Sequence, residues 1–184
     1  MLNTHAVTST GFPAIAGIGV YSNGTNPTVL SSLPAAVLSS QGVSEYYSLV
    51  LPRGVQFNTT DDIISADPDV TLWTINDADV SDLPIAITTQ HKATLDLLAD
   101  LYPNAEVLVQ RNADGSPRNL TPDEVTGKHI IGVLPPFLVA AASAFTSVSI
   151  DGYNAAVDGD LSADELRDRI RIADKAITVE EVQA

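Results

Sequence analysis

The chain has no cysteine and few basic residues, and both shortages exclude classes of function. Without cysteine, its 184 residues cannot form disulfides, thiolate metal sites or a cysteine nucleophile. Only 9 lysines and arginines stand against 23 acidic residues, which gives a formal net charge of -14. Proteins hold polyanions by releasing counterions from Lys and Arg contacts, so we expect no extended nucleic acid as a partner.

Long apolar runs are also missing. No stretch approaches the roughly 18 consecutive apolar residues of a membrane-spanning helix, and the start Met-Leu-Asn-Thr-His lacks the basic region of a signal peptide. Apolar residues still make up 45% of the chain, charged residues only 17%, and the mean hydropathy is +0.13, which excludes global disorder. The sequence predicts a folded, soluble, cytoplasmic protein with no membrane partner.

The composition changes near residue 82. Residues 1–82 are rich in Ser, Thr, Asn, Pro and Gly and contain one basic residue, Arg53, whereas residues 83–184 contain the other basic residues. We expect a strand-rich N-terminal region of unknown role over 1–82 and an α/β domain over 83–184; the alternative is that the polar stretch over 76–82 is a loop within one domain. In the first region, apolar runs predict strands over 14–21, 46–51 and 70–75 and a short helix over 33–40.

Strand-like and helix-like segments alternate after residue 83. The predicted strands cover 85–88, 107–109, 130–134, 148–151 and 177–179. The predicted helices cover 95–102, 137–144 and 162–173, and a single helical turn begins with the capping box Thr121-Pro122-Asp123-Glu124. Such alternation predicts an α/β fold of Rossmann-like type, with a mostly parallel sheet and helices on both faces.

The end of the apolar strand predicted over 130–134 is the first candidate binding site, with Gly132, Leu134 and the following Pro135 as its residues. It runs into a helix of small residues, and in open α/β sheets ligands gather where strands end and helices begin. Backbone N–H groups from Phe137 onward could hold a phosphate there. Pro135 and Pro136 have no N–H group, however, so a buried strand that turns into a packed helix is the simpler alternative.

The polar segment after residue 87 is the second candidate. It places the hydroxyls of Thr88 and Thr89, the amide of Gln90, the imidazole of His91 and the ammonium of Lys92 at a strand-to-helix junction. These groups can position a phosphate or a ribose hydroxyl, and histidine can transfer a proton near neutral pH. The alternative is that Thr89 is an ordinary helix cap and that His91 and Lys92 lie on a solvated first turn.

Further cations follow at Arg111, Arg118 and the pair Lys128-His129. If the sheet brings these segments together, they form one electropositive spot that attracts an anionic ligand; separate exposed charges are the alternative. Carboxylates are frequent over 151–164, but their spacing does not fit a calcium-binding loop. Zinc-protease, P-loop and serine-nucleophile motifs are missing too, so we expect no metal and no cofactor.

Four short segments carry a family resemblance through their order and spacing. They are Thr-Thr-Gln-His at 88–91, Val-Leu-Val-Gln at 107–110, Ile-Gly-Val-Leu-Pro at 131–135, and Val-Ser-Ile-Asp at 148–151 followed by 161–166. With these segments, residues 85–181 resemble a family of small CRISPR-associated proteins of the Csx type, regarded as ring nucleases or their relatives. The resemblance covers a little over half the chain and leaves residues 1–82 without a counterpart.

The resemblance implies an α/β fold and the metal-independent cleavage of a cyclic oligoadenylate second messenger. In such cleavage a ribose 2′-hydroxyl attacks the adjacent phosphate; His91 would assist proton transfer, and Lys92 or Arg111 would stabilise the developing charge. A cyclic, symmetric ligand would suit a homodimer. Three positions depart from the family: Gln90 stands where it tends to have Arg, the second strand ends in Gln110-Arg111-Asn112 in place of a His-Leu-Asp-like run, and Val133 replaces a Thr. A chain that has kept the fold and lost the reaction is therefore an open alternative.

A second hypothesis is a non-enzymatic structural or assembly protein, for example a viral virion component that carries an inactive α/β domain. Few lysines, no cysteine and a polar, strand-rich first half suit a subunit that packs against its neighbours. A third hypothesis, an inhibitor that mimics nucleic acid, fits less well because the acidic residues are dispersed and the chain is apolar.

Overall fold

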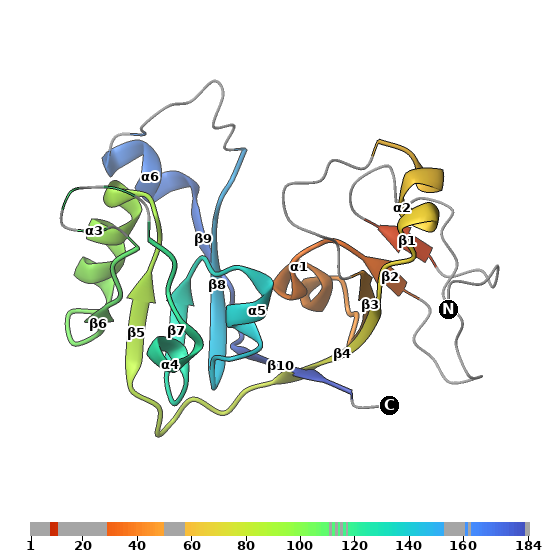
Figure 1. The fold of residues 1–184 in the computed structure, drawn as a ribbon. Coiled ribbons are helices and arrows are strands. Elements are labelled where there is room, and N and C mark those ends of the chain that lie inside the picture. Colours follow the sequence, from red (N-terminus) through yellow and green to blue (C-terminus); the bar gives the residue numbers. More distant parts are fainter. Residues whose placement is uncertain are drawn as a thin grey trace. The chain divides into compact units, whose positions relative to one another are not determined.

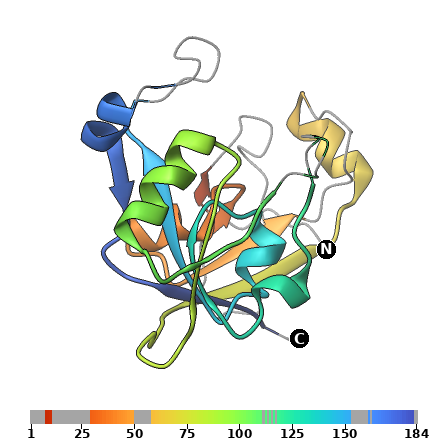
Figure 2. The same cartoon turned by 90° about the vertical axis from the view of Figure 1, so that its left-hand side faces the viewer.

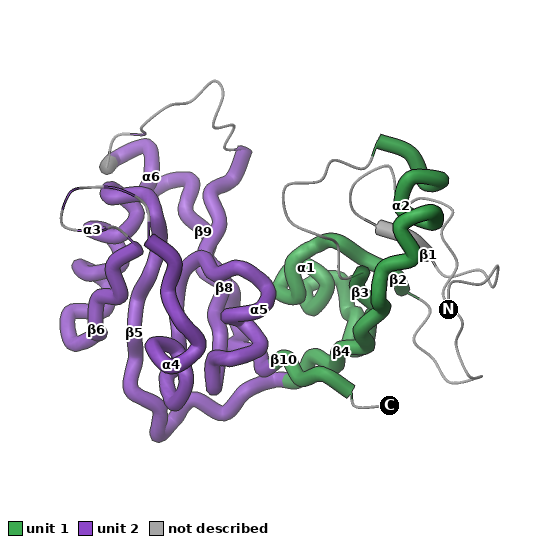
Figure 3. Tube along the Cα trace, viewed as in Figure 1, with its two compact units in different colours: residues 1–76, 179–184 green, residues 77–178 purple. Residues whose placement is uncertain are grey.

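The chain forms two compact units in a computed structural model, residues 1–76 with 179–184 (unit 1) and residues 77–178 (unit 2) (Figure 3). The structure describes residues 8–10, 29–49, 58–110, 112, 114, 116, 118–152, 161 and 163–182. The sequence predicts the division at residue 82, whereas the units meet at residues 76 and 77 and the C-terminal residues belong to unit 1. The strand predicted over 14–21 lies outside the described residues.

Unit 1 combines short strands with two helices. Its elements are β1 (Thr8–Thr10), β2 (Val29–Ser31), α1 (Ala35–Ser40), β3 (Glu45–Leu49), α2 (Thr60–Ala66) and β4 (Val70–Asp77). β2 pairs in parallel with β1 and β3, and β4 pairs antiparallel to β3. The structure confirms the predicted helix and the later two predicted strands, and Gly42, at φ +80°, follows the end of α1 as a helix stop.

Unit 2 is a mixed α/β unit (Figure 1). Its elements are β5 (Ile85–Thr88), α3 (Lys92–Leu101), β6 (Glu106–Val107), α4 (Pro122–Val125), β7 (His129–Gly132), α5 (Pro136–Val139), β8 (Ala144–Ile150), α6 (Ala163–Arg169) and β9 (Ile170–Ile172). Strand β10 (Ile177–Glu181) begins in unit 2 and ends in unit 1. The predicted strands and the capping box at Thr121 are confirmed.

The strand order of unit 2 creates a switch point in the sheet. β6, β5, β7 and β8 are parallel neighbours in that order, while β9 and β10 pair antiparallel with β8, so the sheet is mostly but not purely parallel. The chain runs from β5 to β6 on one side and then crosses back to β7 on the other side. Ligands of open α/β sheets bind at the carboxyl ends of strands at such a reversal.

Helices cover both faces of this sheet. On one face Ile87 and Ile131 pack with Leu98 of α3 and Val148 in an apolar cluster, which Ile170 and Ile172 complete. Successive side chains of a strand point to opposite faces, so Ala86 and Ile130, which are also buried, face the other side. Figure 2 shows α3 and α6 on one side of the strands and α4 and α5 on the other.

Two predicted helices are shorter than the sequence indicates. The helix predicted over 137–144 is the single turn α5, because Ala144 already pairs with His129 as the first residue of β8. The helix predicted over 162–173 ends at Arg169. Ile170 and Ile172 belong instead to strand β9, which pairs with β8. Their side chains pack against the apolar cluster on the face of the sheet that α3 covers. Among the described residues no helix has both the length and the apolar character needed to cross a membrane.

His129 makes the stability of unit 2 depend on pH. The imidazole is buried at the start of β7, and its Nε2 lies 2.8 Å from Thr146 Oγ1. Burial lowers the pKa of His129 below its ordinary value of 6.5, because the charged form is desolvated. The unfolded chain therefore takes up the proton more readily, and the contribution of His129 to stability is present above pH 6.5 and is lost as the pH falls below it.

We expect the pH profile of stability to flatten in His129→Gln. The free energy of unfolding of the wild-type protein, from urea titrations, should fall more steeply than that of the variant as the pH is lowered from about 7 to about 5. Parallel pH profiles for the two proteins would show that the buried imidazole does not titrate differently in the folded and unfolded states.

Candidate functional site

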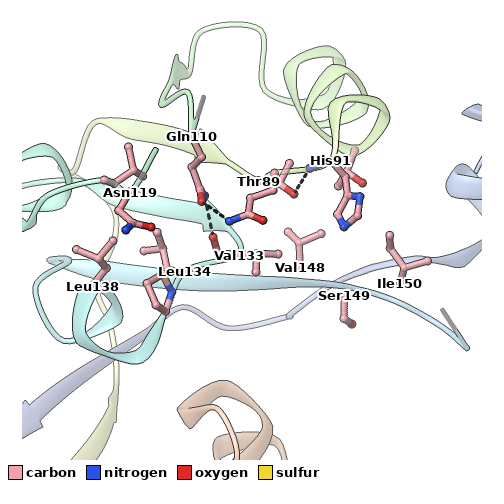
Figure 4. A pocket seen from close by; sticks show the side chains of 14 residues that line it. Thr89, His91, Gln110, Asn119, Val133, Leu134, Leu138, Val148, Ser149 and Ile150 are labelled. Carbon is pink, nitrogen blue, oxygen red and sulfur yellow. Dashed lines mark hydrogen bonds between the residues drawn. The ribbon is translucent and has the colours of Figure 1, made fainter. Parts of the chain in front are cut away.

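A cavity of about 530 Å³ opens at the switch point of unit 2 (Figure 4). This volume lies within the range of small-molecule sites, roughly 300–1,000 Å³. Side chains reach it from four segments: Thr89, Gln90, His91 and Thr94 after β5; Gln110, Asn119 and Leu120 after β6; Val133, Leu134, Pro135 and Leu138 after β7; and Val148, Ser149 and Ile150 at the end of β8. The parallel strands thus bring together segments that lie far apart in the sequence.

Half of the predicted site residues line this cavity. Thr89, Gln90 and His91 come from the junction of β5 and α3, and Leu134 and Pro135 come from the junction of β7 and α5. They meet because β5 and β7 are parallel neighbours, with Thr88 paired to Gly132. The two candidate segments of the sequence therefore form opposite parts of one site.

Thr88 and Gly132 do not line the cavity but hold its two sides together. The N–H group after Gly132, on Val133, donates to the Thr88 carbonyl at 3.0 Å. Gly132 has φ +148°, and a Cβ atom added there would lie 1.8 Å from that same carbonyl oxygen. Only glycine permits this approach of the two strands, which explains the glycine at this position.

A buried amide ties the loop after β6 to both strands. Gln110 Nε2 donates to Thr88 Oγ1 at 2.9 Å and to the Val133 carbonyl at 3.3 Å. Thr88 Oγ1 in turn donates to the Leu108 carbonyl at 2.8 Å, and Gln90 Nε2 donates to Gln110 Oε1 at 3.4 Å. Gln110 therefore fixes one wall of the cavity through neutral hydrogen bonds.

We expect Gln110→Ala to lower the free energy of unfolding by about 1–3 kcal/mol, because buried partners of the amide lose their hydrogen bonds. Chemical denaturation monitored by circular dichroism measures this change. Asn112→Ala, on the same loop but exposed, is the control and should stay within about 0.5 kcal/mol of the wild type. Equal, small effects of the two substitutions would contradict the role of Gln110.

Those of the predicted cations that the structure describes do not gather around the cavity. Lys92 is exposed and pairs with Asp96 at 2.6 Å, and Arg118 pairs with Glu124, whose pKa falls to about 2 mainly because the guanidinium hydrogen-bonds to it. Lys128 pairs with Glu106 at 2.8 Å.

The expected electropositive spot is therefore not assembled from the described residues. Lys128 and His129 lie at the start of β7, so in a parallel sheet they sit at the edge opposite to the carboxyl ends that form the cavity. Phe137 is 44% exposed and does not line the cavity. Arg111 lies outside the described residues, as do Asp158 and Asp160.

The first turn of α3 borders the cavity without a cap. The N-cap residue His91 makes no capping hydrogen bond with its side chain, and the turn contains no acidic residue. Thr89 is not the predicted helix cap; its Oγ1 accepts a hydrogen bond from the His91 N–H at 3.3 Å (Figure 4). Thr94, on the third residue of α3, is 2% exposed, and its Oγ1 has no hydrogen-bond partner among the described residues. An unsatisfied buried hydroxyl costs about 1–3 kcal/mol.

The lining combines apolar side chains with neutral polar groups. Leu134, Leu138, Val148 and Ile150 provide apolar surface, and His91 has the only titratable side chain among the described lining residues. This composition suits a flat or partly apolar ligand that is oriented by a few hydrogen bonds.

Sequence reasoning missed several lining residues. Thr94 precedes the helix predicted over 95–102, Leu138 belongs to the helix predicted over 137–144, and Ser149 belongs to a predicted strand; the sequence gives none of them a role in the site. The carboxyl end of β8 could have been predicted as part of the site. Because β8 is parallel to β7, the carboxyl ends of the two strands lie at the same edge of the sheet. Asn119, in contrast, reaches the cavity through an irregular loop that has no periodic signal.

Comparison with known proteins adds no relative: no protein-family model, no curated protein and no solved structure matches this chain.

Proposed function

We propose that unit 2 is a Rossmann-like domain that binds a nucleotide in the switch-point cavity. The single observation that carries this proposal is the position of the cavity, at the carboxyl ends of β5 and β7 where the strand order reverses. Dinucleotides and mononucleotides bind at this place in open α/β sheets because helix N-termini and strand ends meet there.

The lining fits the parts of a nucleotide. The half-buried side chains of Leu134 and Ile150 offer apolar surface for a base, and the exposed amide of Gln90 can form hydrogen bonds with a base edge or a ribose. Gln110 is less available, because its Nε2 already donates to Thr88 and Val133. The proposal therefore assigns recognition to Gln90 and support of the site to Gln110.

Within this class we propose a cyclic oligoadenylate as the ligand and its cleavage as the reaction. A ribose 2′-oxygen forms a bond to the adjacent phosphorus, the bond from phosphorus to the 5′-oxygen breaks, and the products carry a 2′,3′-cyclic phosphate and a 5′-hydroxyl. The 2′-hydroxyl loses a proton and the 5′-oxygen gains one. His91, whose side chain lines the cavity, is the group that would assist these proton transfers.

The side chain of Lys92 has no part in this proposed reaction. Its ammonium pairs with Asp96 on the exposed side of α3, and it does not line the cavity. Because the ligand is cyclic and symmetric, we propose that two copies of the chain act together as a homodimer.

The direct test is incubation of the purified protein with cyclic tetra-adenylate and cyclic hexa-adenylate in EDTA, with products separated by chromatography and binding measured by calorimetry. The proposal predicts binding of at least one ring and linear products that end in a cyclic phosphate. Binding without cleavage would retain the nucleotide site and reject the reaction. Neither binding nor cleavage would reject both.

A further inference from the structure

We propose that the first turn of α3, together with the hydroxyl of Thr94, forms a subsite for one phosphoryl group of the ligand. This inference rests on the proposed nucleotide site and specifies where the charge of the nucleotide lies. It also implies that the described part of the cavity accepts only one anionic group of a ligand.

The backbone N–H groups at the start of α3 are the first feature that favours an anion there. The first N–H groups of any helix have no partner within it, and here the N–H groups of Lys92, Ala93 and Thr94 meet no acceptor among the described residues. Their partial positive charge favours an anion, and no carboxylate in the turn competes for them. At 10 residues, α3 is long enough for its peptide dipoles to add.

Thr94 provides the second, independent argument. Its side chain belongs to the wall of the cavity and is 98% buried, yet its Oγ1 has no partner in the described part of the chain. Buried hydroxyls are nearly always hydrogen-bonded, so an orphan of this kind requires an explanation. A phosphoryl oxygen at the helix N-terminus would accept hydrogen bonds from this hydroxyl and from the N–H groups of the same turn.

The other charges near the cavity set the limit of one anionic group. Lys92 and Arg118 are each paired with a carboxylate, and the described lining contains no Lys or Arg. A triphosphate would bring several charges into a cavity that offers mainly neutral donors, on a chain with a net charge of -14. A monophosphate or a single phosphodiester of an oligoadenylate matches these donors better.

Calorimetric titration with adenosine, adenosine 5′-monophosphate and adenosine 5′-triphosphate tests the subsite in the full chain. We expect the monophosphate to bind about tenfold more tightly than adenosine, because hydrogen bonds to a charged group are the stronger kind, and the triphosphate to gain no more than the monophosphate. Thr94→Val should lower the affinity for the monophosphate toward that of adenosine, whereas Thr94→Ser, which keeps the hydroxyl, should retain it.

Several outcomes would overturn the inference. If the protein binds adenosine and its monophosphate with equal affinity, the nucleoside site is retained and the phosphoryl subsite is rejected. The subsite is also rejected if Thr94→Val binds the monophosphate as tightly as the wild-type protein does. Should Thr94→Val not fold, Thr94→Ala removes the same hydroxyl.

If neither adenosine compound binds, the proposed nucleotide function fails, and inorganic phosphate then tests the anion subsite alone. Shifts of the amide resonances of residues 92–94 that weaken in Thr94→Val support the subsite, and no shift rejects it.

Discussion

Gly132→Ala should destabilise the protein by about 3 kcal/mol or more, at the upper end of the effects of point mutations. The added Cβ would lie 1.8 Å from the Thr88 carbonyl oxygen, a backbone atom that cannot move without breaking the pairing of β5 and β7. The residue would also be held at φ +148°, which side chains rarely tolerate. Urea denaturation of the variant and the wild type measures the difference.

Gly127→Ala is the matched control for this prediction. Gly127 also has a positive φ, +75°, but a Cβ atom there meets nothing within 4 Å. The control therefore has the backbone penalty, roughly 1–2 kcal/mol, without the collision. If both variants lose the same stability, the close approach of β7 to β5 does not constrain residue 132.

His91→Ala should lower the rate of ring cleavage by about 100-fold or more, because a positioned acid or base typically contributes 10²–10⁴-fold. The stability should change by no more than about 0.5 kcal/mol, because His91 is an exposed residue at the N-cap of α3. Single-turnover cleavage of the ring in EDTA, with thermal unfolding of the same samples, measures both quantities.

Lys92→Ala is the control for His91→Ala. The two residues are neighbours at the start of α3, but the side chain of Lys92 forms an exposed pair with Asp96, which contributes about 0.3–0.5 kcal/mol. The substitution to alanine removes this side chain and keeps the backbone N–H of residue 92. We expect the control to cleave at nearly the wild-type rate. A stable His91→Ala variant with full activity would reject the assignment of His91 even if the reaction itself is found.

Local sequence signals predicted much of unit 2. The β-branched run at Ile85–Thr88 and the apolar run that begins at Ile130 lie in strands, and the capping box at Thr121 begins a single helical turn. These signals act over a few residues and do not depend on distant contacts. They also placed Thr89 to His91 and Leu134 to Pro135 at the ends of strands, where five of the predicted residues line the cavity.

Pairing between distant strands decided what the sequence could not predict. Ile170 and Ile172 fit the apolar side of a helix, but their pairing with β8 and burial against α3 favour a strand. The position of Lys128 depends on which edge of the sheet the start of β7 occupies. Thr94 shows no signal in the sequence, because an unsatisfied hydroxyl is recognised only when its neighbours in space are known.

Whether the switch-point cavity binds a nucleotide can be measured by a heteronuclear NMR titration with adenosine 5′-monophosphate and with cyclic tetra-adenylate. We expect both ligands to shift the amide resonances of residues 89–94, Gln110, Val133 and Ser149, which lie at the cavity. Thr94→Val should reduce the shifts in residues 92–94 and leave the others. An absence of shifts at ligand concentrations near the limit of solubility, or shifts confined to residues of unit 1, would show that the cavity is not a nucleotide site.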